Sequence, residues 1–348
     1  MISYLKKSLP LLILISAVPC VADYSLSAES FAPDPQYCLV AGDGGNVFIS
    51  SNGGYLWALD VTLNIDVRGA VAFDDGGAVV VGGSCKGVSI DFLTKTVTCD
   101  IFKRNPLSGN WTKSNLVAYA PTFNNIDRLN AVAFCNVSLG FVVGSNGGIL
   151  RTVDSGGTWT LITSGVSGNF NVVACSVITK AAGPPQVVVV AAGDQGLLAQ
   201  SLDAGTSWSR SSTILYSSGY STGNITSLLW GSGTLKGLAL LRGSPGGIYY
   251  TIDAGYTWSP VSLPVSFLSW SPAAAAAPFA PAAAPLPYRS ILLGSDAAAS
   301  PPRWLPLQSS VPVAQALSPS APAFVWANMS APAPIDAVLS IAAAGLGR

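Results

Sequence analysis

The sequence predicts an all-β protein, and within that class a β-propeller of four-stranded blades, about five to seven in number. Three observations predict this fold. A motif of the form Ser/Thr-x-Asp-x-Gly-x-x-Trp recurs at intervals of about fifty residues. A glycine-rich turn and short apolar runs precede each copy. The runs are rich in β-branched and aromatic residues, which favours strands over helices.

The N-terminal residues 1–22 have the pattern of an export signal. Lys6 and Lys7 precede a short apolar run, and small residues at 20–22 form a cleavage site. The apolar run is too short to cross a bilayer. We therefore expect an exported chain, with a short N-terminal segment at 23–37 before the first blade.

Residues 38–265 contain the predicted propeller repeats. Three copies of the motif are complete, and the first copy has Asn in place of Asp. Between the first copy and the second, Trp111 ends a decayed copy. The positions that define the copies are Asn52 and Trp57; Asp154, Gly156 and Trp159; Asp203, Gly205 and Trp208; and Asp253, Gly255 and Trp258.

The motif is interpreted as a hairpin device. The Asp carboxylate is expected to accept hydrogen bonds from backbone amides two and three residues further on. The Gly supplies a positive φ, and the Trp begins the next strand and fills the space between neighbouring sheets. One unit then consists of a strand, a turn, a strand, a glycine-rich turn, a strand, the Asp-Gly turn and a strand. Because the motif recurs in each unit, we expect its acids to be structural rather than catalytic.

The composition excludes most enzyme chemistry. The chain has no His, and its 17 Lys plus Arg balance 17 Asp plus Glu. Catalytic triads, histidine bases and His-ligated zinc are therefore absent. A basic surface for nucleic acid is also not expected. The remaining option is Asp-based chemistry, because Glu29 is the only glutamate and precedes the predicted first blade. We expect no catalytic, cofactor-binding or metal-binding residue.

Export makes disulfides expected. Cys85 and Cys99 bracket one predicted hairpin and are the first candidate pair. Cys135 and Cys175 lie at comparable positions in successive repeats and could pair across neighbouring units, which would leave Cys38 free. Candidate glycosylation sites of an exported protein are Asn110, Asn136, Asn224 and Asn328.

The motif resembles the Asp box, also called the bacterial neuraminidase repeat (BNR). The unit formed by Leu129–Phe134, Gly140–Gly144, Gly147–Thr152 and Asp154–Trp159 is most similar to repeats of the photosystem II stability and assembly factor family. It is more distantly similar to sialidase-type propellers. The resemblance extends over residues 38–262.

The family resemblance implies a non-enzymatic scaffold that binds a protein partner, such as photosystem II reaction-centre protein, during complex assembly. It implies the thylakoid lumen as the location; in a non-photosynthetic source the chain would be secreted. It also implies an arginine-rich surface. Arginines are spread over the units here, for example Arg68, Arg104, Arg128, Arg151 and Arg210.

The alternative is a secreted carbohydrate-binding or glycoside-hydrolase-like protein of the sialidase superfamily, with a glycan as ligand. Sialidases need three arginines, an Asp acid/base and a Tyr activated by Glu, and this chain lacks their N-terminal Phe-Arg-Ile-Pro segment. A hydrolase that uses two Asp carboxylates stays open. In either case we expect neither a cofactor nor an integral membrane protein.

Residues 266–348 are rich in Ala and Pro and nearly free of charge. Such a composition is typical of extended or disordered segments. A propeller must nevertheless close, so a degenerate sixth blade is one interpretation of this region. A linker, a stalk or an error in the reading frame are the others.

Overall fold

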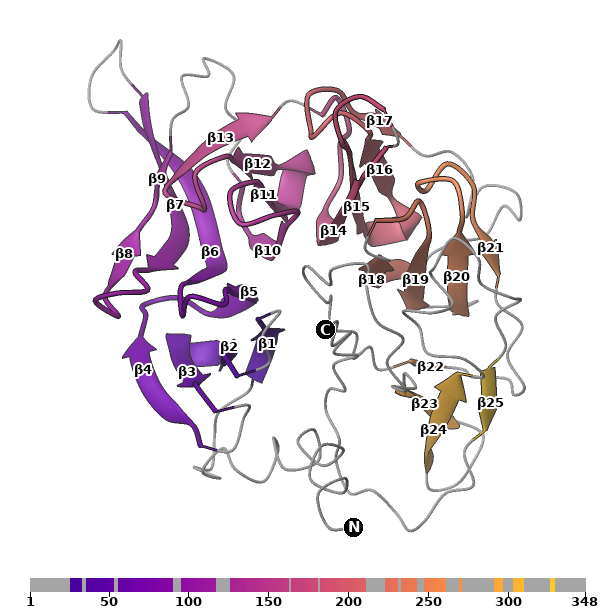
Figure 1. The fold of residues 1–348 in the computed structure, drawn as a ribbon, viewed down its shortest axis with the longest axis horizontal. Coiled ribbons are helices and arrows are strands. Elements are labelled where there is room, and N and C mark those ends of the chain that lie inside the picture. The colour runs from indigo at the N-terminus through magenta and orange to yellow at the C-terminus, as the bar shows by residue number, and fades with distance from the viewer. Residues whose placement is uncertain are drawn as a thin grey trace.

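The fold is described from a computed structural model. The structure describes residues 26–32, 36–52, 56–89, 95–116, 126–162, 164–180, 182–210, 223–230, 233–242, 247–260, 269–270, 291–296, 303–309 and 326–328. In these residues the strands form six sheets, arranged as blades around a common axis (Figure 1). The predicted all-β propeller of four-stranded blades is therefore confirmed. No helix in this part of the chain is long and apolar enough to cross a membrane.

Blades 1 to 3 come from the first half of the chain. Blade 1 contains β1 (Leu26–Phe31), β2 (Cys38–Gly42), β3 (Asn46–Ser50) and β4 (Ala58–Thr62). Blade 2 contains β5 (Val67–Ala72), β6 (Ala78–Ser89), β7 (Lys95–Arg104) and β8 (Trp111–Lys113). Blade 3 contains β10 (Leu129–Phe134), β11 (Gly140–Gly144), β12 (Ile149–Thr152) and β13 (Thr158–Ile162). The short strand β9 (Asn115–Leu116) adds to blade 3 parallel to β13.

Blades 4 to 6 follow the same order. Blade 4 contains β14 (Phe170–Ile178), β15 (Gln186–Gly193), β16 (Leu198–Ser201) and β17 (Ser209–Arg210). Blade 5 contains β18 (Asn224–Trp230), β19 (Gly237–Arg242), β20 (Gly247–Thr251) and β21 (Ser259–Pro260). The sixth sheet contains β22 (Ser269–Trp270), β23 (Ile291–Asp296), β24 (Arg303–Ser309) and β25 (Trp326–Asn328). It lies in the Ala/Pro-rich region.

The first blade begins earlier than the sequence predicts. β1 comes from the segment 23–37, which was expected to precede the propeller, and it pairs antiparallel with β2. Glu29 therefore lies in the first strand of blade 1 rather than before it. The physical reason is that β2, β3 and β4 supply only part of a four-stranded blade, so a further strand must cover β2 on its axial side. The predicted export signal, residues 1–22, lies outside the described residues.

The hydrophobic core lies between the blades. The first strands of successive blades contact one another from β1 through β5, β10 and β14 to β18. Four apolar clusters fill the four interfaces of blades 1 to 5, and each cluster draws side chains from two adjacent blades. Runs such as Ala78–Val81 and Val188–Ala192 are buried on both faces of the sheet. This explains why apolar residues do not alternate with polar ones along these runs.

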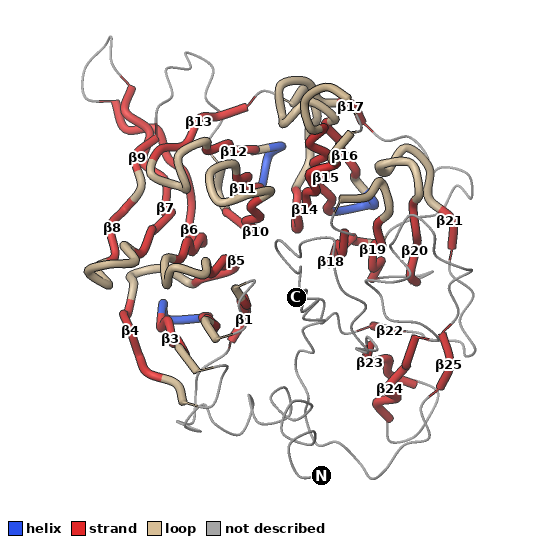
Figure 2. The backbone as a smooth tube through the Cα atoms, in the orientation of Figure 1, coloured by secondary structure: helices blue, strands red, loops and turns tan. Residues whose placement is uncertain are grey.

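The turns fall into two sets at opposite ends of the blades. The Asp-box hairpins join the third strand to the fourth, and we call this the Asp-box end. The turns between the second and third strands are the 3-10 turns η1 (Asp43–Gly45), η2 (Ser145–Gly147) and η3 (Asp194–Gly196), visible in blue in Figure 2. We call their side the 3-10 end. In blade 2 an extension of β6 and β7 replaces this turn.

Candidate functional site: Asp-box hairpins and inter-blade contacts

The Asp box of blade 3 is a closed hydrogen-bond network. The Thr152 hydroxyl donates to Asp154 Oδ1 over 2.8 Å and accepts from the Gly156 amide over 3.0 Å. The Thr158 amide and hydroxyl donate to the two oxygens of Asp154 over 2.8 and 2.7 Å. Trp159 Nε1 donates to the Gly156 carbonyl over 3.2 Å. Both carboxylate oxygens thus accept hydrogen bonds that shape the turn.

The same network repeats in blades 4 and 5. Its members are Ser201, Asp203, Gly205, Ser207 and Trp208 in blade 4, and Thr251, Asp253, Gly255, Thr257 and Trp258 in blade 5. A carboxylate with the same partners in three blades is a structural element. No single copy differs from the others in a way that would make it a catalytic centre.

The geometry differs from the sequence expectation in one respect. In blade 3 the carboxylate accepts from the amide four residues on, while the amide two residues on donates to the preceding hydroxyl. The amide three residues on contributes at Asp203 and Asp253. The reason is that two successive residues, Ser155 and Gly156, have positive φ, which turns the chain back sharply. Sequence reasoning also missed the hydroxyl residue directly before each Trp, which is present in all three complete copies.

Glycine is required in this turn for two reasons. Gly205 has a φ of 82°, where a β-carbon is disfavoured. A β-carbon there would also overlap the ring of Phe141 in the preceding blade. The Asp-box hairpin therefore fits closely against the neighbouring blade, which the tryptophan rings also contact.

The Asp-box carboxyls are held ionised. Burial alone would raise the pKa of Asp154, but hydrogen bonds from Thr158 and Thr152 outweigh it, so the pKa lies below its usual value. Hydrogen bonds from Ser207 and Ser201 outweigh burial at Asp203, and those from Thr257 and Thr251 at Asp253, so these pKa values are also lowered. A general acid near neutral pH needs the opposite shift.

This lowering predicts how stability changes with pH. A carboxyl with a lowered folded-state pKa contributes stability fully above its unfolded-state pKa of about 3.9, and loses it as pH falls through the folded-state value. Urea unfolding between pH 3 and pH 7 should therefore show that acidification lowers the free energy of unfolding more for the wild type than for Asp203→Asn. Identical pH dependence in the two proteins would contradict the assigned hydrogen bonds.

The first two blades carry altered versions of the motif. In blade 1 Asn52 Oδ1 accepts from the Ser50 hydroxyl and the Leu56 amide over 2.9 Å each. In blade 2 Trp111 occupies the Trp position, and its Nε1 donates to Asp60 of blade 1 over 2.6 Å. The altered copy in blade 2 therefore supports the contact between blades instead of its own turn.

Asp60 is the centre of this contact. Arg104 Nε and Nη2 donate to its two oxygens over 2.8 and 3.2 Å, and Arg104 Nη1 donates to the Gly76 carbonyl over 2.7 Å. The Asp60 and Arg104 side chains are only 16% and 14% exposed. Burial raises the pKa of Asp60, but Arg104 and Trp111 outweigh it and lower the pKa.

Four further carboxylates also serve turns and contacts within or between blades. Asp75 accepts from the Gly77 amide, and Asp66 accepts from the Gly44 amide of the preceding blade. Asp100 accepts from the Ser84 amide and Lys113, and Asp194 from Asn169 and Asn171. In the described part of the chain no group of three or more His, Cys, Asp or Glu could hold a metal ion.

A set of polar residues that sequence reasoning missed lies on the first strands. Each first strand of blades 1 to 5 has a β-bulge directly after its first or second paired residue. The bulged residues are Ser27, Arg68, Asn130, Asn171 and Thr226. The sequence signal for these bulged positions is a polar residue near the start of each apolar run. Bulges redirect side chains, so these positions are suited to join blades.

Two of the bulged residues join neighbouring first strands. Asn130 Nδ2 donates to the Phe170 carbonyl over 2.7 Å, and Asn171 Nδ2 donates to the Ile225 carbonyl over 3.3 Å. Arg68 Nε and Thr226 Oγ1 are buried without a hydrogen-bond partner among the described residues. We name Arg68, Asn130, Asn171 and Thr226 the inter-blade collar.

A second link recurs at the 3-10 end. The middle residue of each 3-10 turn has positive φ and donates its backbone amide to the side chain of the residue that precedes or begins the first strand of the next blade. Gly44 donates to Asp66, Asn146 to Asn169, and Gln195 to Asn224. The first of these distances is 2.9 Å and the others are 3.2 and 3.1 Å.

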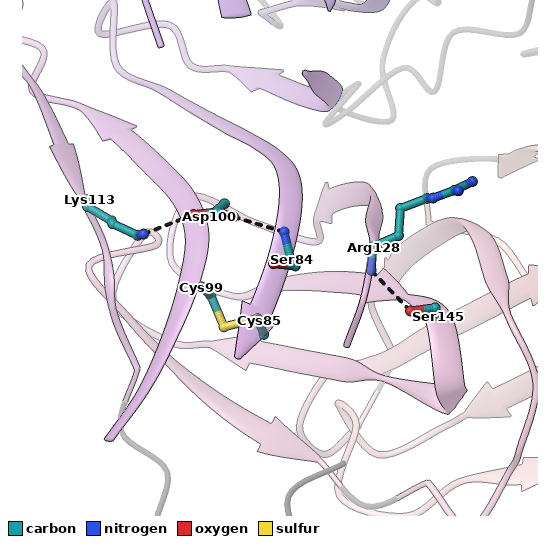
Figure 3. The surroundings of a disulfide bond; sticks show 7 residues. All are labelled: Ser84, Cys85, Cys99, Asp100, Lys113, Arg128 and Ser145. Atoms are coloured by element: carbon teal, nitrogen blue, oxygen red, sulfur yellow. Dashed lines mark hydrogen bonds and ion pairs between the residues drawn. A yellow bond between two sulfur atoms is a disulfide. The ribbon is translucent and has the colours of Figure 1, made fainter. Parts of the chain in front are cut away.

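The five arginines considered for an arginine-rich surface are spread over blades 2 to 4. Arg68 belongs to the collar, Arg104 binds Asp60, and Arg151 and Arg210 lie on β12 and β17. Arg128 lies before β10, where its amide donates to Ser145 Oγ and its side chain projects away from the disulfide drawn in Figure 3.

Among the described residues, Gln200 is the most deeply buried polar residue whose side chain has atoms without a hydrogen-bond partner. It is 1% exposed, and neither Oε1 nor Nε2 has a hydrogen-bond partner among the described residues. Its Oε1 lies close to Gly255 of the next blade. An unpaired buried amide costs about 1–3 kcal/mol.

Gln200→Met should therefore raise the free energy of unfolding by about 1 kcal/mol, because it keeps the side-chain length and removes the unpaired amide. Urea denaturation measures the change, and Gln195→Met at the exposed η3 turn is the control. A loss of stability in Gln200→Met would show that the amide has a partner.

Both predicted cysteine pairs form disulfides. Cys85 and Cys99 lie directly opposite each other on β6 and β7 (Figure 3). Cys135 and Cys175 join blade 3 to blade 4. Cys38 is buried and not in a disulfide, and burial raises its pKa to about 12.

The candidate glycosylation sites differ in position. Asn110 and Asn136 are exposed in turns at the Asp-box end of blades 2 and 3. Asn224 is exposed at the start of β18, where its side-chain oxygen accepts from Gln195. The side chain of Asn328 lies outside the described part. Whether any of these carries a glycan stays a prediction.

The blades show the repeat unit in three dimensions, and the comparisons with known proteins agree with it. The family model "Photosynthesis system II assembly factor YCF48" matches residues 119–265. The chain is a BNR-type β-propeller that resembles YCF48. No curated protein matches the chain by sequence.

Two solved structures of YCF48 are similar to the chain. The structure "YCF48 bound to D1 peptide" is 13% identical, with a TM-score of 0.50 over 88% of this chain and 82% of that one. YCF48 from Cyanidioschyzon merolae is 14% identical, with a TM-score of 0.52 over 90% of this chain and 87% of that one. At these identities the likeness concerns the fold.

The match to the YCF48 family model falls on blades 3 to 5, where all three complete Asp boxes lie. The altered copies at Asn52 and Trp111 lie outside it. The sequence match to the family model thus coincides with the blades in which the hairpin network is complete.

Proposed function

We propose that the chain is a non-enzymatic scaffold that binds a protein partner during the assembly of photosystem II. The match of residues 119–265 to the YCF48 family model carries this proposal. The proposed partner is the D1 reaction-centre protein, since one similar structure is that of YCF48 with a D1 peptide. The proposed location is the thylakoid lumen, reached through the export signal at 1–22.

The chemistry of the described acids supports a scaffold over an enzyme. Each Asp-box carboxylate accepts three hydrogen bonds from donors of its own turn, and Asp60 is paired with Arg104 and Trp111. Their lowered pKa values suit stable anions rather than proton donors. A glycosidase of the inverting or retaining kind needs one carboxyl with a raised pKa.

The test is to express the tagged full chain in a photosynthetic host and isolate it from solubilised membranes. We expect D1 to co-purify, and we expect no hydrolysis when the same preparation is incubated with plant and algal polysaccharides. Hydrolysis that a single Asp→Asn change abolishes, without co-purified D1, would replace this proposal with the glycoside-hydrolase alternative.

A further inference from the structure

The two disulfides occupy different environments. Cys85 and Cys99 are 0% and 3% exposed, and they join two strands of one blade within the core shared by blades 2 and 3. The Cys85 backbone also pairs with Ile126 in both directions. Cys135 is nearly buried, whereas Cys175 is partly exposed, and their bond joins β14 of blade 4 to the turn that follows β10 of blade 3. Of these two disulfides, only the second includes a cysteine that is not buried, Cys175.

The interface between blades 3 and 4 has further supports. At the 3-10 end Asn130 and Asn146 donate to Phe170 and Asn169 of blade 4, and an apolar cluster fills the middle. The disulfide lies toward the Asp-box end, because Cys135 follows the last residue of β10. Loss of the disulfide would therefore release one end of the interface and leave the other end held.

The next interface shows that such packing holds without a covalent link. Blades 4 and 5 share the same two kinds of hydrogen bond, from Asn171 to Ile225 and from Gln195 to Asn224. An apolar cluster lies between them, and no disulfide joins their described residues. We therefore expect blades 3 and 4 to stay together when their disulfide is reduced.

We propose that Cys135–Cys175 is a redox latch that a dithiol opens in the folded protein, while Cys85–Cys99 stays oxidised as a permanent structural link. This inference is independent of the proposed function. The partner is a small dithiol or the paired cysteines of a thiol–disulfide oxidoreductase.

The reaction balances as a thiol–disulfide exchange. A thiolate of the dithiol attacks Sγ of the partly exposed Cys175, the Cys175–Cys135 bond breaks, and Cys135 leaves as a thiolate that takes a proton. The second thiol then attacks the mixed disulfide and releases Cys175 as a thiol. The protein disulfide gains two electrons and two protons, and the dithiol becomes a disulfide. Cys38 does not compete, because it is buried and its raised pKa keeps it a thiol.

The test uses the purified full chain and dithiothreitol. Samples are equilibrated with increasing reductant, quenched with iodoacetamide and mapped by peptide mass spectrometry, while circular dichroism and tryptophan fluorescence report the fold. We expect Cys135 and Cys175 to be alkylated at reductant levels that leave the fold and Cys85–Cys99 intact. We also expect Tm to fall by roughly 5–10 °C, as for the loss of a disulfide that closes a long loop.

The matched control is Cys135→Ser with Cys175→Ser, which should have the Tm of the reduced wild type and should not respond to the same dithiothreitol. Joint reduction of both disulfides, earlier reduction of Cys85–Cys99, or reduction only on unfolding would each overturn the proposal. If the double variant does not fold, the order of alkylation in the folded wild type still decides whether Cys135–Cys175 is reduced before Cys85–Cys99.

Discussion

Trp159→Ala is expected to lower the free energy of unfolding by about 3–5 kcal/mol, the usual cost of truncating a fully buried large aromatic side chain. Trp159 is 1% exposed and lies edge-to-face against Phe134 at a centroid distance of 6.0 Å. Its Nε1 also satisfies the Gly156 carbonyl within the Asp box. The change therefore opens a cavity and removes a hydrogen bond in the same hairpin. Guanidinium chloride unfolding followed by circular dichroism measures the loss.

Trp208→Ala is the matched control. Trp208 occupies the same position in blade 4, donates to Gly205 in the same way and packs edge-to-face against Phe141 at 6.2 Å. It is only partly buried, so its loss should cost clearly less than that of Trp159. An equal or larger cost for Trp208→Ala would contradict the account in which burial at the blade interface, rather than the hairpin alone, determines the stability.

Asp60→Ala is expected to lower the free energy of unfolding by about 2–3 kcal/mol. The change leaves the Arg104 guanidinium and the Trp111 Nε1 without their shared acceptor, and both lie in a poorly exposed contact between blades 1 and 2. Breaking a fully buried ion pair costs about 3–5 kcal/mol, and partial exposure reduces that figure. Urea unfolding with tryptophan fluorescence should show the shift.

A surface ion pair in blade 2 provides the control. Lys113 lies 2.9 Å from Asp100, but its side chain is 45% exposed. Lys113→Ala should therefore change the free energy of unfolding by no more than about 1 kcal/mol. If Asp60→Ala were as mild as Lys113→Ala, the contact between blades 1 and 2 would not depend on Asp60.

The propeller fold could be predicted because its signals are local and repeated. The positions of Asp154, Gly156 and Trp159 recur with constant spacing, and each has a clear role within one hairpin. The pair Cys85–Cys99 was also predictable, since both residues bracket one hairpin. Local turn chemistry of this kind is encoded in a short stretch of sequence.

Contacts between blades were harder to predict, because they join residues far apart in the chain. Nothing in the sequence near Asp60 indicates that it binds Arg104 and Trp111 of the next blade. The roles of Asn130 and Asn171 depend on a bulge that redirects their side chains, and a bulge is not visible in a single apolar run. The start of blade 1 could not be read from the motif, because the motif marks the hairpin between the third and fourth strands of a blade and gives no signal for the first strand.

The central claim, that the chain is a binding scaffold whose Asp-box acids are structural, is tested most directly by a titration of the folded protein with overlapping D1 peptides, followed by fluorescence anisotropy. The account predicts saturable binding of at least one peptide, with a dissociation constant that Asp203→Asn leaves unchanged while it lowers stability. The absence of binding by every D1 peptide to the folded chain would contradict the account, as would binding that Asp203→Asn abolishes without unfolding the protein.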